Sequence, residues 1–103
     1  MRRLTDPYKG MQENDIPQIT ELANLLFAPQ DIAVILGIDD IEGFRMACGK
    51  IGTTEYQAYN AGRLQQEVIL RRSILTLAKQ GSSPAQTLAK KMLDESAAKI
   101  YDR

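Results

Sequence analysis

Side chains that could carry out catalysis are few in this chain. Its 103 residues include no histidine and a single cysteine, Cys48. Zinc sites of the Cys/His type, Ser-His-Asp triads and Cys-His nucleophiles are therefore excluded within one chain. No phosphate-binding loop, metal cluster or paired nucleophile and base accompanies the remaining reactive side chains, which include Tyr56, Tyr59, Asp94 and Glu95. We expect no enzymatic activity, no catalytic residue, no bound metal and no cofactor.

The segment from Pro29 to Ile38 is the part of the sequence that most clearly indicates a function. This segment predicts a short helix that ends at Gly37 and turns directly into another helix. Ala33 and Gly37 are four residues apart, a spacing at which a small residue lets two helices cross closely and a glycine takes the turn between them. The pattern is typical of a helix-turn-helix, and it indicates DNA binding.

The helix that would enter the major groove is less typical of this motif. It begins Asp39-Asp40-Ile41-Glu42, whereas base edges are read mainly by basic, amide and hydroxyl side chains. Phosphate would repel these carboxylates, so a helix-turn-helix without DNA binding is a rival interpretation. We expect base or backbone contacts from Gln30, Arg45 and Lys50, and contacts of a basic arm from Arg2, Arg3 and Lys9.

Formal charge limits DNA binding by a single copy. Lysine plus arginine total 13, and aspartate plus glutamate also total 13, so the net charge is zero. Free-standing DNA-binding domains usually carry a basic surplus. Clustering of the cations, or many copies acting together, would compensate for the missing surplus.

Composition and hydropathy predict an intracellular, soluble protein that is one domain in size. A single cysteine forms no disulfide within the chain and suits a reducing cytoplasm, and we expect Cys48 to be a buried thiol. No apolar run approaches the ~20 residues of a membrane span, and the first residues lack the apolar core of a signal peptide. We expect no membrane partner.

Apolar spacing, prolines and glycines predict an all-α chain. The expected helices cover residues 17–27, 29–36, 41–47, 54–80 and 84–100. Residues 1–15 read as an irregular basic arm, 16–50 as a three-helix helix-turn-helix unit, and 54–101 as a long helical hairpin. Gly62 marks either a kink in the long helix or a place where another backbone approaches. The expected caps are Asp15, Asp39 or Asp40, Thr53 or Thr54, and Ser83 with Gln86 in a capping box.

The hairpin is more apolar than one core face requires. A helix that packs on one side needs an apolar stripe of ~100°, and the second half of the long helix exceeds it. Either the three-helix unit folds back onto this surface, or part of it is an oligomer interface, which is our preferred interpretation. The residues that we expect in the interface are Val68, Leu70, Ile74, Leu75, Leu77 and Met92.

Three consecutive segments resemble one known family. They are Ala58-Tyr59-Asn60-Ala61-Gly62-Arg63, then residues 67–74 (EVILRRSI), then residues 78–86 (AKQGSSPAQ). In this order they are similar to the small terminase subunits of tailed bacteriophages and prophages. The upstream residues 27–38 fit the start of the helix-turn-helix in that family, so the resemblance covers residues 20–90.

The resemblance implies a non-catalytic subunit that forms a ring-like homo-oligomer in the cytoplasm of a bacterial host cell. Such a subunit recognises the packaging site on double-stranded viral DNA and presents that DNA to the large terminase subunit, which hydrolyses ATP. By this analogy residues 16–48 contact DNA and residues 54–100 build the ring. Two alternatives remain open: a small dimeric prophage transcriptional regulator, and a helical protein-interaction module without DNA binding.

Overall fold

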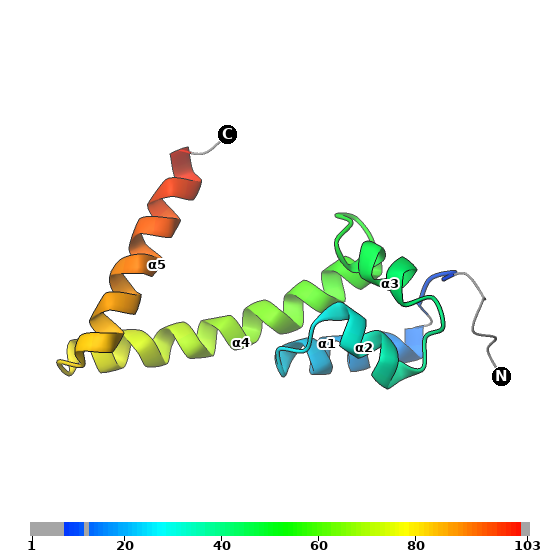
Figure 1. The fold of residues 1–103 in the computed structure, drawn as a ribbon, viewed down its shortest axis with the longest axis horizontal. Helices are drawn as coiled ribbons and strands as arrows, with labels where there is room; N and C mark the ends of the chain where they lie inside the picture. Colours follow the sequence, from blue (N-terminus) through cyan, green and yellow to red (C-terminus); the bar gives the residue numbers. More distant parts are fainter. Residues whose placement is uncertain (1–7, 12, 102–103) are drawn as a thin grey trace. The chain divides into compact units, whose positions relative to one another are not determined.

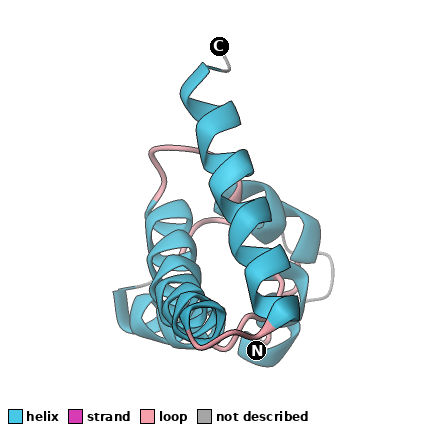
Figure 2. Cartoon of the chain, turned by 90° about the vertical axis from the view of Figure 1, so that its left-hand side faces the viewer, coloured by secondary structure: helices cyan, strands magenta, loops and turns pink. Residues whose placement is uncertain are grey.

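The computed structural model describes residues 8–11 and 13–101, and in this part of the chain all regular structure is helical (Figures 1 and 2). The all-α class predicted from the sequence is confirmed. In chain order the elements are the 3-10 helix η1 (Glu13–Asp15), then α1 (Ile16–Asn24), α2 (Pro29–Leu36), α3 (Ile41–Cys48), α4 (Thr54–Lys79) and α5 (Ser83–Tyr101).

The chain divides into two compact units, and the boundary falls inside α4. Unit 1 extends to Gln66 and unit 2 begins at Glu67. The first turns of the long helix therefore belong with α1, α2 and α3. The apolar core of the described residues lies almost entirely in unit 1.

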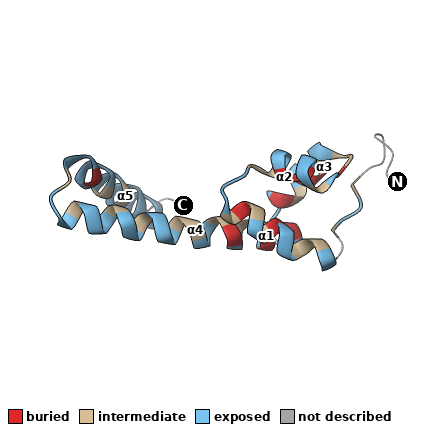
Figure 3. Cartoon of the chain, turned by 90° about the horizontal axis from the view of Figure 1, so that it is seen from below, coloured by how far each residue is buried: buried red, intermediate tan, exposed pale blue. Residues whose placement is uncertain are grey.

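The core of unit 1 joins side chains from four helices. Figure 3 colours the buried positions on the backbone of these helices. Phe44 of α3, Ile19 of α1 and Ile32 of α2 are its largest fully buried side chains. The ring of Tyr8 packs edge-on against Phe44, with the ring centroids 5.6 Å apart. The remaining members of the cluster are Ala23, Ala33, Ile38, Cys48 and Ala58.

The connection between α2 and α3 depends on one glycine. Gly37 has a φ of 72°, in the left-handed region where a side chain is strained. It ends α2, and the N–H of Ile38 then donates to the carbonyl of Ala33 at 2.9 Å. Asp40 caps α3, because its carboxylate accepts a hydrogen bond from the N–H of Gly43 at 3.0 Å. The predicted end of α2 is confirmed, and of the two caps that the sequence left open, Asp39 or Asp40, the structure has Asp40.

The end of α1 differs from the prediction. The helix stops at Asn24 rather than at residue 27, because Leu26 adopts a φ of 69° and reverses the chain. Asp15 occupies the N-cap position, but its side chain makes no capping hydrogen bond. The apolar spacing of Leu25, Leu26 and Phe27 therefore continued past the point where the backbone leaves the helix.

The starts of the two long helices also refine the predicted caps. Thr53 caps α4, since its hydroxyl accepts from the N–H of Tyr56 at 3.0 Å. At α5 the hydroxyl of Ser82, and not that of Ser83, accepts from the N–H of Ala85, at 3.4 Å. The side chain of Gln86 donates to the carbonyl of Ala78 at the end of α4, so the predicted capping box is wrong.

Gly62 is a site of close backbone approach, and α4 continues through it. A Cβ on Gly62 would overlap the carbonyl oxygen of Thr20 on α1. The side-chain amide of Asn24 donates to the carbonyl of Gly62 at 3.2 Å, which fastens the end of α1 to α4. Of the two readings of this glycine, close approach is the correct one.

Unit 2 contains the rest of α4, a tight turn and α5. The turn includes Gly81, whose φ is 99°. Among residues 67–100 only Ala85 is buried (Figure 3). This unit therefore has helical structure without an apolar core of its own in a single chain.

Candidate nucleic-acid interface

An open hollow on unit 1 brings together two of the residues that we expected to contact DNA. It has a volume of about 460 Å³, and both Gln30 of α2 and Arg45 of α3 line it. Lys50, in the turn after α3, and Lys9, before η1, are exposed and lie outside the lining. Arg2 and Arg3 lie outside the residues that the structure describes.

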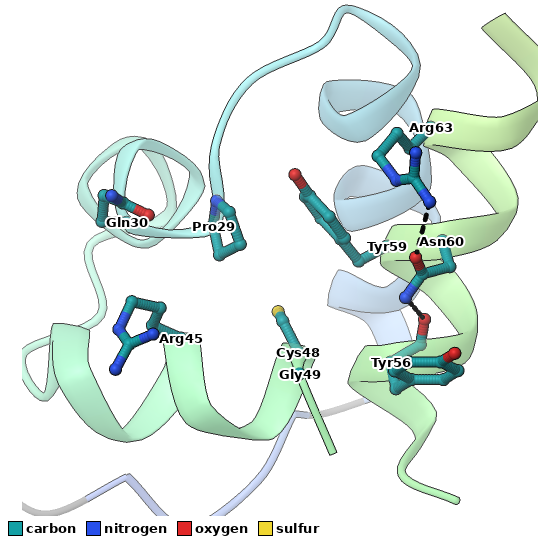
Figure 4. Close-up of a pocket in the computed structure, with 9 residues that line it drawn as sticks. All are labelled: Pro29, Gln30, Arg45, Cys48, Gly49, Tyr56, Tyr59, Asn60 and Arg63. Atoms are coloured by element: carbon teal, nitrogen blue, oxygen red, sulfur yellow. Dashed lines mark hydrogen bonds between the residues drawn. The ribbon is translucent and has the colours of Figure 1, made fainter. Parts of the chain in front are cut away.

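Three elements form the walls of this hollow (Figure 4). The start of α2 supplies Pro29 and Gln30, and the end of α3 supplies Arg45, Cys48 and Gly49. The third wall is the first part of α4, which was not among the expected DNA contacts. It contributes Tyr56, Tyr59, Asn60 and Arg63.

The spacing of the α4 residues in the lining is visible in the sequence, but we interpreted this segment as part of the oligomerising hairpin. Tyr56, Asn60 and Arg63 are four and three residues apart, so they share one side of a helix. They stand in the segment that carries the family resemblance, which we had placed wholly in the oligomerising hairpin. Only the packing of α4 against α1 shows that this side faces α2 and α3.

The polar side chains of α4 are held by hydrogen bonds (Figure 4). The amide of Asn60 donates to the carbonyl of Tyr56 at 2.9 Å, and its oxygen accepts from the guanidinium of Arg63 at 3.2 Å. The hydroxyl of Tyr59 donates to the carbonyl of Phe27 at 3.2 Å. Burial raises the pKa of Tyr59, so this hydroxyl stays protonated at neutral pH.

Arg45 forms a two-point ion pair with Glu42 one turn earlier on α3. Its Nε donates to Oε2 of Glu42 at 3.0 Å, and its Nη2 contacts Oε1. The hydrogen bond from Arg45 lowers the pKa of Glu42, and the same bond raises the pKa of Arg45. Both side chains are about half exposed, at 48% for Arg45 and 66% for Glu42, so a competing anion in solvent can reach them.

The acidic start of α3 has a structural explanation for two of its carboxylates. Asp40 is the cap, and hydrogen bonds from the backbone N–H groups of Tyr8 and Gly43 lower its pKa. Glu42 is paired with Arg45. One oxygen of Asp39 is buried without a hydrogen-bond partner in the described residues. Of the three carboxylates that we expected to repel phosphate, Asp40 and Glu42 therefore have partners within the fold, and Arg45 compensates the charge of Glu42.

Tyr8 joins the chain before η1 to both α3 and α4. Its N–H donates to Oδ2 of Asp40 at 2.8 Å, and its hydroxyl donates to Oε2 of Glu55 at 2.6 Å. Thr54 donates to the other oxygen of Glu55 at 2.7 Å. Burial raises the pKa of Glu55, but the hydrogen bonds from Tyr8 and Thr54 outweigh it, so the pKa lies below its usual value. We predicted an irregular basic arm over residues 1–15, and that prediction did not include this link.

Cys48 supplies a buried sulfur and no reactive group. Its side chain is buried, as predicted, and lies beside the hollow (Figure 4). Burial, with the nearby charge of Glu55, raises the pKa of the Cys48 thiol to about 12. A thiol with this pKa stays protonated at neutral pH and is a poor nucleophile. In the described part of the chain no group of acidic or thiol side chains is arranged to hold a metal ion.

The side chains that we expected in an oligomer interface are at the surface of unit 2. Val68, Leu70, Leu75 and Leu77 are exposed, and Ile74 and Met92 are half-buried. The same unit exposes further large apolar side chains that the prediction left out: Ile69, Leu88, Leu93 and Ile100.

The chain matches no protein-family model, no curated protein and no solved structure. Within the residues that the structure describes, no helix has the length and apolar content needed to cross a membrane.

Proposed function

We propose that this protein is a non-catalytic, oligomeric DNA-binding subunit. In this proposal α2 and α3 act as a helix-turn-helix on double-stranded DNA, and unit 2 joins copies of the chain. The observation that carries the proposal is the arrangement of α3. Phe44 and Cys48 bury one side of this helix in the core, while Glu42, Arg45 and Met46 are exposed away from that side.

The dimensions and side chains of α3 are compatible with the major groove. An α-helix with its side chains is about 10–12 Å in diameter, comparable to the ~12 Å width of the groove. Arg45 offers a fork of donors for guanine or phosphate, while Met46 offers an apolar contact of the kind that thymine methyl groups accept. Lys50, exposed just beyond the end of α3, is placed to contact the backbone.

Oligomerisation is supported by the surface of unit 2. Apolar side chains exposed together on a small unit without a core usually mark an interface, and units below about 40 residues seldom fold stably alone. Joining several weak DNA-binding units also offsets the zero net charge, because each added contact forms at a high effective concentration.

The resemblance to small terminase subunits gives this proposal its biological setting. We propose that the oligomer, a ring by analogy, binds the packaging site of a phage or prophage genome in the bacterial cytoplasm. It would then present that DNA to the large terminase subunit. A dimer in solution would favour the transcriptional regulator instead, and an oligomer without salt-dependent DNA affinity would favour the interaction module.

The test is DNA binding as a function of salt, measured together with solution mass. We expect R45A/K50A to weaken binding at least about tenfold and to lower the salt slope by about two, with no change in mass. The matched control is R72A/K99A, which removes one arginine and one lysine from unit 2. Equal affinity of R45A/K50A and the wild type would remove α3 from the interface.

A further inference from the structure

We propose that the hollow of unit 1 receives the sugar-phosphate backbone of one DNA strand, with Arg63 of α4 as a phosphate contact. This inference rests on the proposed function and deepens it. It makes the start of the long helix part of the DNA-binding surface, alongside the helix-turn-helix.

The charge of the lining favours an anion. Two of its side chains are guanidinium groups, and no carboxylate lines it among the residues that the structure describes. Arg45 is paired with Glu42, which lies outside the lining. A guanidinium presents its donors in a planar fork that matches two phosphate oxygens. Arg45 and Arg63 lie on opposite sides of the hollow (Figure 4), an arrangement suited to different phosphates of one strand rather than to a single ion.

Arg63 is held on a rigid support. Asn60 accepts a hydrogen bond from its guanidinium at 3.2 Å, and Asn60 is itself bonded to the backbone of Tyr56. The adjacent residue Gly62 packs directly against the backbone of α1, which fixes this part of α4 within unit 1. A donor oriented before binding loses little conformational entropy when it meets its phosphate.

The size and the neutral side chains of the hollow favour a stretch of backbone over a bare ion. Its volume of about 460 Å³ is far larger than one phosphate group. Gln30 and Tyr56 carry neutral donors of the kind that commonly contact phosphate and sugar oxygens. In a duplex the bases are stacked and cannot enter a hollow, whereas the backbone can. The contact is therefore expected to be independent of sequence.

The experiment compares R63A, R63K and the control R72A, all on α4, on duplexes of two unrelated sequences. We expect R63A to weaken binding about tenfold on both duplexes and to lower the salt slope by about one. R63K keeps the charge and should retain the slope with an intermediate affinity. R72A should bind as the wild type does.

Each other outcome has a distinct meaning. Wild-type binding by R63A, while R45A/K50A is impaired, would overturn the hollow and leave the proposed function standing. A loss on one sequence alone would show that Arg63 reads a base, which also overturns the inference. If the wild-type protein has no salt-dependent affinity for DNA, the proposed function itself fails. If R63A unfolds below the assay temperature, R63K decides. A lower salt slope for R63K, which keeps the positive charge, would exclude a simple charge contact with phosphate.

Discussion

At the scale of single residues, Glu42 is a side chain that would oppose the proposed binding of DNA. It holds Arg45 in a two-point ion pair, on the exposed side of α3. The sequence showed an acidic helix start and a nearby arginine, but the spacing alone did not show that they neutralise each other. A phosphate that approaches Arg45 competes with the Glu42 carboxylate for the charge of the guanidinium.

We therefore expect E42Q to bind DNA more tightly than the wild type. The substitution frees the guanidinium and removes a negative charge from the proposed interface, so affinity should rise about two- to tenfold. Fluorescence anisotropy at fixed salt measures this change. The matched control is E95Q, which removes a carboxylate paired with Lys91 one turn away on α5. Weaker binding by E42Q would mean that Glu42 orients Arg45 instead of competing for it.

At the scale of elements, helix identity followed from the sequence more reliably than helix ends. The bounds of α2 were predicted correctly, because Pro29 and Gly37 act through local backbone geometry. The end of α1 was missed because apolar spacing continues through Phe27, whose carbonyl instead accepts a hydrogen bond from Tyr59 on α4. The helix ends at the left-handed Leu26, where the N–H groups of Leu26 and Phe27 donate back to the carbonyls of Ala23 and Leu22. A glycine, which usually marks such a turn in a sequence, is not present there.

The link from Tyr8 to Glu55 stabilises unit 1 at neutral pH, and we expect this contribution to the free energy of unfolding to be lost in acid. The pKa of Glu55 is lowered in the folded protein, so its contribution is complete above its unfolded pKa and is lost as pH falls through the folded value. Y8F should lower the free energy of unfolding by about 1.5–3 kcal/mol at neutral pH, the usual contribution of a hydrogen bond to a charged group.

Thermal or urea unfolding at pH 7 and at pH 3 measures this effect. The difference between Y8F and the wild type should shrink at the lower pH, where a larger fraction of Glu55 is protonated. Y56F, which removes a tyrosine hydroxyl elsewhere in unit 1, serves as the control. A difference that is the same at both pH values would show that the loss does not depend on the charge of Glu55.

At the scale of the whole molecule, burial is concentrated in unit 1, while unit 2 presents its apolar side chains to solvent. Such a distribution supports assembly of several chains. The expected interface residue Leu75 is 44% exposed in the single chain, so we expect the isolated fold to tolerate a charge there.

We expect L75D to lower the solution mass of the oligomer. A buried, unpaired aspartate at an apolar interface is strongly destabilising, so the assembly should dissociate. Light scattering measures the solution mass. T87D adds the same charge at an exposed position of α5, on the side that carries Lys91 and Asp94, and should leave the mass unchanged. Circular dichroism checks that the helices persist. An unchanged mass for L75D would place the interface elsewhere.

The sequence by itself determined the all-α class, the turn at Gly37 and the apolar character of unit 2. These properties depend on local backbone preference and on the spacing of apolar residues, both of which are set by residues close together in the sequence. Only the tertiary structure decided that Gly62 is a packing site, that Tyr8 is joined to Glu55, and that Arg63 faces the same hollow as Arg45. Each of these depends on which segments distant in sequence lie against one another, and that choice is made by the burial of the shared core.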